Sequence, residues 1–107
     1  MSRQAAQLSY IRECIEKIES YTRDLDYSGF CETPLIQDAV LRNLQIMTES
    51  TQRLSESFRK NHPDVEWRKI SGLRNILVHD YLGIDLETVW NILAGDLQDL
   101  KKVLPAP

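Results

Sequence analysis

Apolar side chains recur every three or four positions along most of this chain, and this spacing constrains its fold more than any other feature. Near the N-terminus the recurring positions are Leu8, Ile11, Ile15, Ile18, Thr22 and Leu25. This is the period of one face of an amphipathic α-helix. No stretch of useful length shows the alternation of a β-strand. The sequence therefore predicts an all-α fold.

Turn and capping residues divide this pattern into helices. The first helix should begin after Ser2 and end at the break over residues 26–30. Thr33 and Pro34 predict the start of the second, because proline is favoured at the first helical position. The second helix should run to the turn at residues 62–64, and its inner face should carry Val40, Leu44, Met47, Thr51, Leu54 and Phe58.

Two aspartates predict the starts of the last two helices. Asp64 can cap a third helix over about residues 65–81, which Gly83 should stop. Asp85 can cap a fourth helix, whose apolar stripe is Leu86, Val89, Trp90, Leu93, Leu97, Leu100 and Leu104. Because short turns force consecutive helices to lie side by side, we expect an antiparallel up-and-down four-helix bundle.

Length and composition favour a single domain over residues 1–107, with residues 105–107 as a disordered tail. Cys14 and Cys31 lie far apart, and the N-terminus does not resemble a signal peptide, so we expect a cytoplasmic protein with reduced thiols. No apolar run approaches the roughly 20 residues that span a bilayer. Two distant histidines without a carboxylate cluster do not indicate a metal site.

The charge distribution is uneven. The net charge of −3 argues against a general nucleic-acid binder, since lysine and arginine supply most of the affinity for phosphate. Residues 53–74, however, hold six basic and three acidic side chains, a net charge of +3. An ordinary solvated pair of helices explains this segment equally well.

The third helix carries two residue types that can cleave RNA. Arg74 is permanently cationic and suits a phosphate oxygen, whereas His79 can take and give a proton near neutral pH. The two are five residues apart, so they point about 140° away from each other on an ideal helix. The long arginine side chain could curve round the helix towards the histidine, or a symmetric dimer could bring one residue from each copy into a single cleft. Taken alone, each has an ordinary structural explanation, as a surface cap or a salt-bridge residue.

Two further positions bear on this interpretation. Asn75 lies four residues before His79 and can hydrogen-bond to the imidazole or to a substrate. Gly72 shares the polar side of the helix with both, where a second backbone could approach closely. This side of the helix is a candidate dimer contact, although a merely tolerated glycine is an equal alternative.

The segment WRKISGLRNILVHDY, from Trp67 to Tyr81, resembles the signature of the HepT-like toxins of the HEPN superfamily. That signature is an arginine, four residues, a histidine, any residue and a tyrosine, often with a polar residue directly after the arginine, as Asn75 is here. Trp90 and the turn over residues 82–85 also resemble the family. The resemblance covers about residues 40–104, where Thr48 replaces a usual glycine.

The resemblance implies a metal-independent endoribonuclease that needs no cofactor and is the toxin of a type VII-like toxin–antitoxin system. It further implies a homodimer with the active cleft at its interface and an RNA substrate, such as tRNA or mRNA. His79 would remove a proton from the RNA 2′-hydroxyl, and Arg74 would stabilise the charge that builds on the phosphate.

Tyr81 has a separate implied role. Toxins similar to this chain are silenced by a nucleotidyltransferase antitoxin of the minimal (MNT) type, which adds AMP to the motif tyrosine. Each added group would bring negative charge and bulk that exclude RNA. The alternative is that Tyr81 only packs the third helix against the fourth.

Two other interpretations remain open on the sequence. The chain could be a non-catalytic helical partner of a nucleotidyltransferase, for which a broken Arg–His pair would be expected. It could also be a plain oligomeric bundle, which the acidic net charge favours and the motif opposes.

Overall fold

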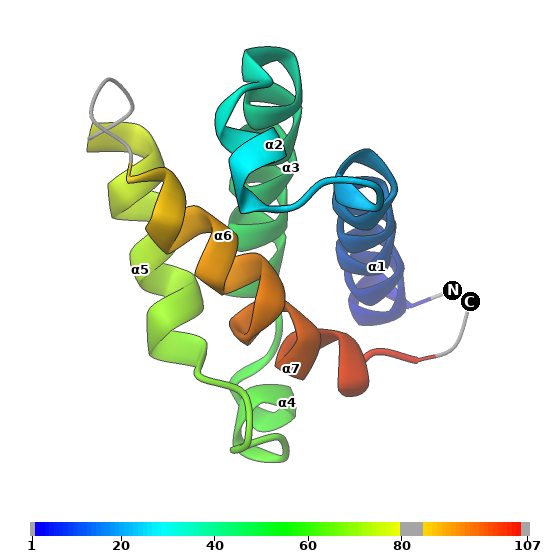
Figure 1. Ribbon diagram of the computed structural model, residues 1–107. Coiled ribbons are helices and arrows are strands. Elements are labelled where there is room, and N and C mark those ends of the chain that lie inside the picture. Colours follow the sequence, from blue (N-terminus) through cyan, green and yellow to red (C-terminus); the bar gives the residue numbers. More distant parts are fainter. Residues whose placement is uncertain (1, 80–84, 106–107) are drawn as a thin grey trace.

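The computed structural model describes residues 2–79 and 85–105, and for residues 75–79 it describes the helical backbone alone. The described ranges contain α-helices and no strand, so the predicted all-α fold is confirmed (Figure 1). The helices are α1 (Arg3–Thr22), α2 (Tyr27–Cys31), α3 (Pro34–Gln52), α4 (Glu56–Lys60), α5 (Trp67–His79), α6 (Leu86–Ala94) and α7 (Asp96–Lys102).

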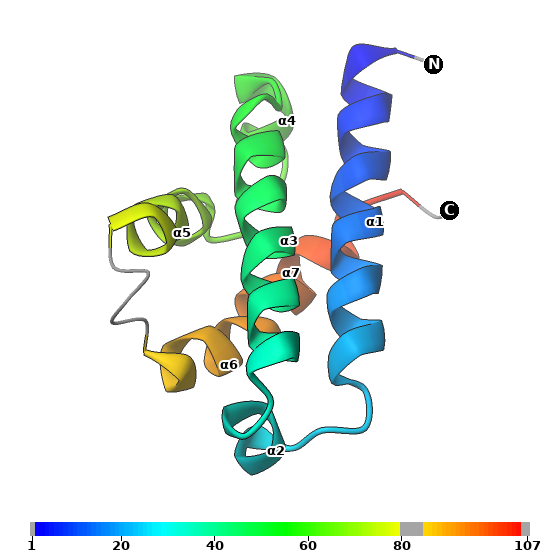
Figure 2. The same ribbon diagram turned by 90° about the horizontal axis from the view of Figure 1, so that it is seen from above.

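The two longest helices, α1 and α3, lie side by side in opposite directions (Figure 2). Ser2 caps α1 as predicted, since its Oγ accepts a hydrogen bond of 3.0 Å from the backbone N–H of Ala5. The stripes predicted for the two helices meet in the core, where Leu8, Ile11, Ile15, Ile18, Val40, Leu44 and Met47 are buried. None of the described helices is long and apolar enough to cross a membrane.

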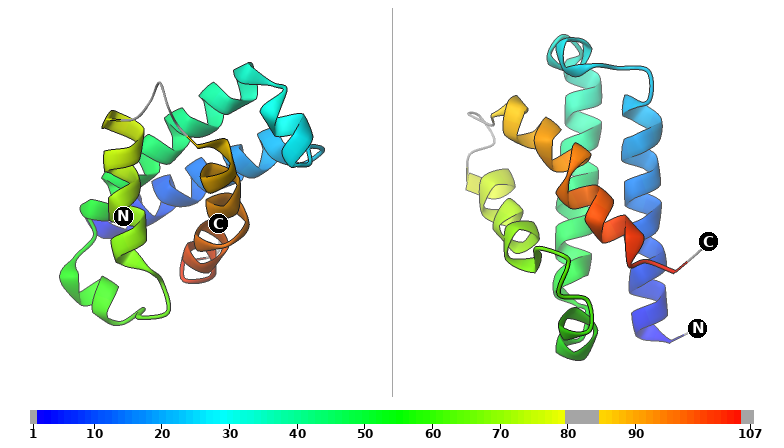
Figure 3. Two further views of the ribbon diagram at one scale, coloured as in Figure 1. Left: turned by 60° about the vertical axis from the view of Figure 1, so that its left-hand side comes forward. Right: turned by 60° about the horizontal axis from the view of Figure 1, so that its bottom comes forward.

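The second half of the chain crosses this pair of helices steeply (Figures 1 and 2). α5 packs against α3, whereas α7 continues as far as α1. The right-hand view of Figure 3 shows α6 and α7 running diagonally across α3 towards α1. The helical bundle therefore consists of an antiparallel hairpin with crossing helices laid over one face.

The second predicted helix is interrupted. α3 ends at Gln52, and Ser55 caps the separate short helix α4 by accepting a hydrogen bond of 3.0 Å from the N–H of Phe58. Leu54 remains buried and Phe58 packs against the core on the far side of the break. Because the apolar spacing continues across it, the periodicity did not reveal this interruption.

The fourth predicted helix is bent into two. Gly95 separates α6 from α7 with φ −114° and ψ −83°, and its N–H donates to the carbonyl of Asn91 at 3.0 Å. A Cβ atom at this position would lie 3.3 Å from the same carbonyl oxygen. Leu93 and Leu97 stay buried on either side of the bend. The expectation of one continuous helix is therefore wrong.

Two smaller differences concern helix starts. The helix α5 begins at Trp67, and the carbonyl of Glu66 accepts its first hydrogen bond, from Ile70 at 3.2 Å. It therefore starts later than predicted, and Asp64 does not directly precede it. The predicted break after α1 contains the one-turn helix α2, where Asp26 accepts a hydrogen bond of 2.8 Å from the N–H of Gly29.

The C-terminal end of the described chain is tied to α1. The guanidinium of Arg12 donates to the carbonyl of Pro105 at 2.7 Å and to that of Leu104 at 3.2 Å. Leu104 is itself buried in the core. Within the predicted tail, residues 106–107 lie outside the described residues.

Candidate active site

Trp67 sets the position at which α5 begins. Its indole Nε1 donates hydrogen bonds to the carbonyls of Arg59 at 3.1 Å and His62 at 3.0 Å. The ring of Phe58 lies edge-on to the indole at 6.3 Å and also packs on the His62 ring at 4.5 Å. His62 is thus a turn residue, as predicted, and the turn it belongs to anchors the motif helix.

The inner face of α5 holds the helix against α3. Ile70 and Leu73 are one turn apart and are 2% and 5% exposed. α5 packs on α3, where Thr48 is fully buried. The hydroxyl of Thr48 donates to the carbonyl of Gln45 at 2.9 Å, so this threonine is accommodated without an unpaired buried donor.

Arg74 follows Leu73 and is exposed, at the point where α5 passes the C-terminal end of α3. Its Nη1 donates a hydrogen bond of 3.3 Å to Oε1 of Gln52, the last residue of α3. The partner is a neutral amide, which orients the guanidinium without cancelling its charge. No carboxylate of a described residue lies within ion-pair distance of it, so this cation can bind a phosphate.

Gln52 was not identified from the sequence. It is the polar end of a helix in a polar stretch, and no motif distinguishes it from its neighbours. Its contact with Arg74 joins positions 22 residues apart. Only the packing of α5 on α3 brings the two side chains together.

The other predicted site residues are described less fully. Asn75 and His79 belong to α5, and His79 ends it. On helical backbone, positions 74 and 79 are separated by about 7.5 Å along the axis and about 140° around it. Tyr81 lies outside the described residues. The helix thus carries Arg74, Asn75 and His79 on one element, but it does not direct positions 74 and 79 the same way.

Gly72 is partly exposed on the same helix. A Cβ atom built there would meet nothing within 4 Å. Among the described residues, packing within the chain therefore does not require a glycine at this position. The two explanations predicted for Gly72, a contact between two copies and a tolerated glycine, both remain compatible with this geometry.

Trp90 anchors α6, the helix that follows the motif in the sequence. Its ring packs against the rings of Phe30 at 5.1 Å and Tyr27 at 6.3 Å, which joins α6 to α2. Asp85 begins α6 as predicted and accepts hydrogen bonds from the hydroxyl of Thr88 at 2.8 Å and the N–H of Glu87 at 3.0 Å. The two tryptophans of the resemblance thus fix the helices before and after residues 80–84.

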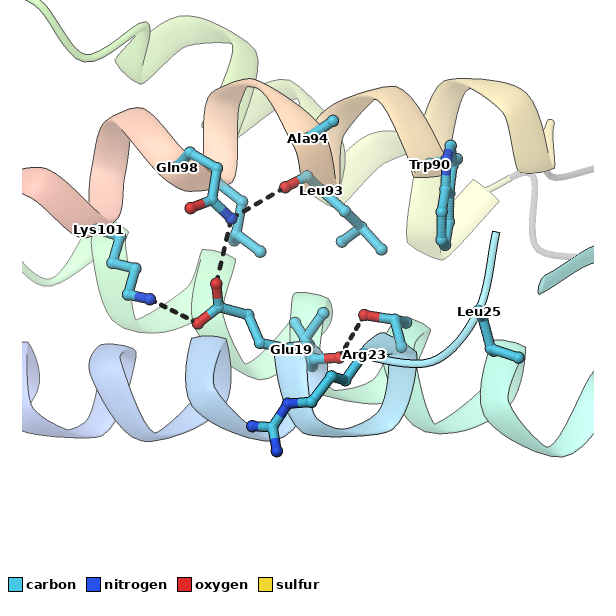
Figure 4. Close-up of a pocket in the computed structure, with 11 residues that line it drawn as sticks. Glu19, Arg23, Leu25, Trp90, Leu93, Ala94, Gln98 and Lys101 are labelled. Carbon is cyan, nitrogen blue, oxygen red and sulfur yellow. Dashed lines mark hydrogen bonds and ion pairs between the residues drawn. The ribbon is translucent and has the colours of Figure 1, made fainter. Parts of the chain in front are cut away.

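A hollow of about 510 Å³ lies away from the motif helix, between α1 and α6–α7 (Figure 4). Its polar side chains bind one another: Glu19 accepts from Lys101 at 2.8 Å and from Gln98 at 3.3 Å. Figure 4 shows Arg23 directed away from it. No residue of α5 lines this hollow, so it is separate from the predicted chemistry.

Neither clustered metal ligands nor an activated Cys14 thiol is found in the described part of the chain. No group of three or more histidine, cysteine, aspartate or glutamate residues there could hold a metal ion. Burial raises the pKa of the Cys14 thiol, which keeps it in the unreactive protonated form.

The chain matches the family model described as "Ribonuclease HepT-like" over residues 11–106. The chain belongs to the HepT-like ribonuclease family of the HEPN superfamily. It is therefore an endoribonuclease, an enzyme whose substrate is RNA. The matched range extends from α1 through α7 and includes Arg74, Asn75, His79 and Tyr81.

Three relatives illustrate this membership. A Methanocaldococcus jannaschii protein named as an RNase is 38% identical over 92 residues, which are 86% of this chain and 84% of the relative. A Thermococcus cleftensis protein named as ribonuclease HepT is 34% identical over 94 residues, covering 88% and 86%. A second M. jannaschii protein, named as both a gamma-glutamylcyclotransferase and an RNase, is 35% identical over 95 residues, covering 89% and 43%. No solved structure matches this HepT-like chain.

Proposed function

We propose that this HepT-like ribonuclease is the toxin of a toxin–antitoxin pair and that it cleaves RNA without a metal ion. The observation that carries the proposed cleavage is the exposed guanidinium of Arg74, which lies on the same helix as His79. It donates a hydrogen bond to the neutral amide of Gln52 on α3. A positioned cation without a carboxylate partner can stabilise the negative charge that builds on the phosphate in the transition state.

The proposed reaction uses the RNA itself as the nucleophile. His79 accepts the proton of a 2′-hydroxyl, and the 2′-oxygen attacks the adjacent phosphorus atom. The bond from phosphorus to the 5′-oxygen breaks, and the leaving 5′-oxygen takes a proton from water. The products are a 2′,3′-cyclic phosphate and a 5′-hydroxyl. Arg74 stabilises the phosphate oxygens during attack, and Asn75 orients the imidazole or the substrate.

A homodimer completes this site. Positions 74 and 79 are about 140° apart around an ideal helix, so we expect two copies of α5 to place both groups at one phosphate. The open space over Gly72 is compatible with such a contact along this helix, because a second backbone can approach closest where no Cβ intervenes.

Cleavage by purified variants tests the proposed roles. Arg74→Ala and His79→Ala should each lower cleavage about 100- to 1000-fold. Lys69→Ala, which removes an exposed cation from the same helix, should cleave RNA like the parent. If Arg74→Ala or His79→Ala cleaves RNA as fast as the parent and Lys69→Ala, the role assigned to that residue is wrong.

We further propose that AMP addition to Tyr81 by an MNT-type nucleotidyltransferase antitoxin silences the enzyme. The added phosphodiester would repel the RNA backbone from the cleft by like charge and by bulk. Incubation with such a partner and ATP should add AMP to the parent but not to Tyr81→Phe, and cleavage should fall with the extent of modification. Modification without any loss of cleavage would contradict this mode of silencing.

A further inference from the structure

A groove runs between the outer faces of α1 and α3. One hollow of about 410 Å³ is lined by side chains of both helices, including Gln7, Tyr10, Arg42 and Arg53. A second, of about 470 Å³, is lined by Arg3, Gln7 and Arg53. Because the two share Gln7 and Arg53, they form one continuous surface, called here the α1–α3 groove.

The groove is strongly basic for this chain. It contains the guanidinium groups of Arg3, Arg42 and Arg53 and the single carboxylate of Glu49, a net charge of +2 on a protein of net charge −3. No carboxylate of a described residue forms an ion pair with the three arginines. Arg42 makes only a long hydrogen bond of 3.5 Å to the amide of Gln45. These cations are available to a polyanion.

An aromatic ring lies among these cations. Tyr10 is 50% exposed, although tyrosine rings usually bury much of their surface. It lines the same hollow as Arg42 and Arg53. Arg3, Gln7 and Tyr10 follow one another at i, i+4 and i+7 on α1, so the ring lies about 10 Å along the helix from Arg3.

At one end of the groove, the first turn of α1 is hydrogen-bonded to the segment that follows α3. Oε1 of Gln4 accepts a hydrogen bond of 3.2 Å from the N–H of Ser55, just beyond α3. This bond joins the first turn of α1 to the region in which Arg53 ends α3. The backbone segments that carry Arg3 and Arg53 are therefore linked at this end of the groove.

The groove adjoins the site of Arg74. Figure 2 shows α3 running between α5 and α1, with its C-terminal end and the N-terminal end of α1 at the same end of the hairpin. Arg74 reaches α3 through Gln52, and the next residue in the chain is Arg53 of the groove. Arg74 and the groove therefore meet the chain at consecutive residues, Gln52 and Arg53, at the end of α3.

We propose that the α1–α3 groove binds a single-stranded segment of the RNA substrate and guides it over the end of α3 to Arg74. Arg3, Arg42 and Arg53 would neutralise successive phosphates, and Tyr10 would stack on a base. A basic groove with an aromatic platform is how proteins hold single-stranded nucleic acid without reading its sequence. This inference rests on the proposed function, because it assigns a path to the RNA that Arg74 and His79 cleave.

A protein partner is the competing occupant, since tyrosine and arginine are also common at protein interfaces. The observations favour RNA. Three arginines without described carboxylate partners suit a polyanion. The apolar centre expected of a protein interface is represented in the lining only by the half-buried Ile46. The enzyme also needs a binding surface for a polyanion that its overall negative charge repels.

Binding can be measured separately from cleavage. The probe is a fluorescent single-stranded RNA oligonucleotide, and the protein is full-length His79→Ala, so that the RNA stays intact. Fluorescence anisotropy then compares two groove variants, Arg42→Gln/Arg53→Gln and Tyr10→Leu, with the control Arg23→Gln. The control removes an exposed cation at the C-terminal end of α1, outside the lining of the groove. The side chains of Tyr10, Arg23, Arg42 and Arg53 are exposed, so thermal unfolding should confirm that the groove variants and the control fold like the His79→Ala protein.

The expected losses are quantitative. The double arginine variant should bind at least tenfold more weakly at low salt, and its slope of log K against log salt should fall by about 1.4, since each phosphate contact on a single strand contributes about 0.7. Tyr10→Leu should bind about 5- to 150-fold more weakly with an unchanged slope. Arg23→Gln should bind like the parent.

A second measurement does not depend on variants. RNA that carries 4-thiouridine should cross-link on irradiation to the peptide that contains Tyr10. In the active protein, the groove variants should raise KM for RNA and leave kcat unchanged. Parental RNA affinity in both groove variants would overturn the proposal. A changed oligomeric mass of the groove variants with unchanged RNA affinity would also overturn it, and would identify the groove as a protein interface.

Discussion

Arg74 on the motif helix and Gln52 at the end of α3 are joined by a hydrogen bond of 3.3 Å between Nη1 and Oε1. The contact links the proposed phosphate-binding cation to a helix that carries none of the motif. Because Gln52 is neutral, it can limit the positions of the guanidinium without competing for its charge. The orientation of Arg74 therefore depends on how α5 packs on α3.

Substitutions at Gln52 should separate orientation from charge. Gln52→Leu removes the hydrogen bond, and we expect kcat for RNA cleavage to fall about tenfold, the cost of one modest hydrogen bond. Gln52→Glu should lower kcat further, because a carboxylate would pair with Arg74 and compete with the phosphate. Both variants should fold, since Gln52 is exposed. Equal activity of Gln52→Glu and the parent would show that this contact does not control how Arg74 acts in cleavage.

Gly72 should control association of two copies. A Cβ there meets nothing within 4 Å in one chain, so Gly72→Arg should leave the fold intact but prevent close contact between two α5 helices. We expect light scattering after size-exclusion chromatography to show a monomer, with cleavage reduced as strongly as in His79→Ala. Gly72→Ala is the matched control, because a methyl group is small and alanine stabilises a helix interior by about 1 kcal/mol relative to glycine. A dimeric Gly72→Arg would contradict the proposed interface.

Phe30 should be a major contributor to stability. It is fully buried and packs on Trp90 with 5.1 Å between ring centroids, so it joins α2 to α6. Phe30→Ala should lower the free energy of unfolding by about 3–5 kcal/mol. Leu35→Ala, at a leucine that is 80% exposed nearby in the sequence, should change it by less than about 0.5 kcal/mol. Urea denaturation of the two variants tests this, and similar values would show that the α2–α6 contact is not part of the stable core.

Asp85 should make the start of α6 sensitive to acid. The hydroxyl of Thr88 and then the backbone N–H of Glu87 lower the pKa of the Asp85 carboxyl below its ordinary value of 3.8. A lowered pKa means that the ionised group stabilises the fold above pH 3.8 and that this stability is lost as the pH falls through the folded pKa. The parent should therefore be more stable than Asp85→Ala at neutral pH, and denaturant titrations should show the difference shrinking below pH 3.8. A difference that does not change with pH would show that the carboxylate charge is not involved.

Sequence periodicity predicted the faces of these helices better than their interruptions. Ser2 and Asp85 were recognisable as caps because a short polar side chain preceded an apolar stripe. The bend at Gly95 was not predicted, because Leu93 and Leu97 keep helical spacing across it and both remain buried. The end of α3 was missed for the same reason, although Ser55 was itself a capping signal that could have revealed it.

The residue types of the candidate site could be predicted from the sequence, but the residues that contact it from other helices could not. The spacing of Arg74, Asn75, His79 and Tyr81 is a local pattern, and family membership agrees with it. The roles of those four residues stay predictions, and Tyr81 lies outside the described residues. Gln52 and the arginines of the α1–α3 groove come together only through contacts between distant parts of the chain, which a local pattern does not encode.

The most direct test of the central claim is cleavage of RNA in excess EDTA by protein whose mass shows that Tyr81 is unmodified. We expect the parent to cut RNA there and leave 2′,3′-cyclic phosphate ends, while His79→Ala does not. A single 2′-deoxy substitution at the cut site should abolish that cut, since it removes the nucleophile. Cleavage that requires an added divalent ion, or that continues at the deoxy position, would contradict metal-free attack by the 2′-hydroxyl.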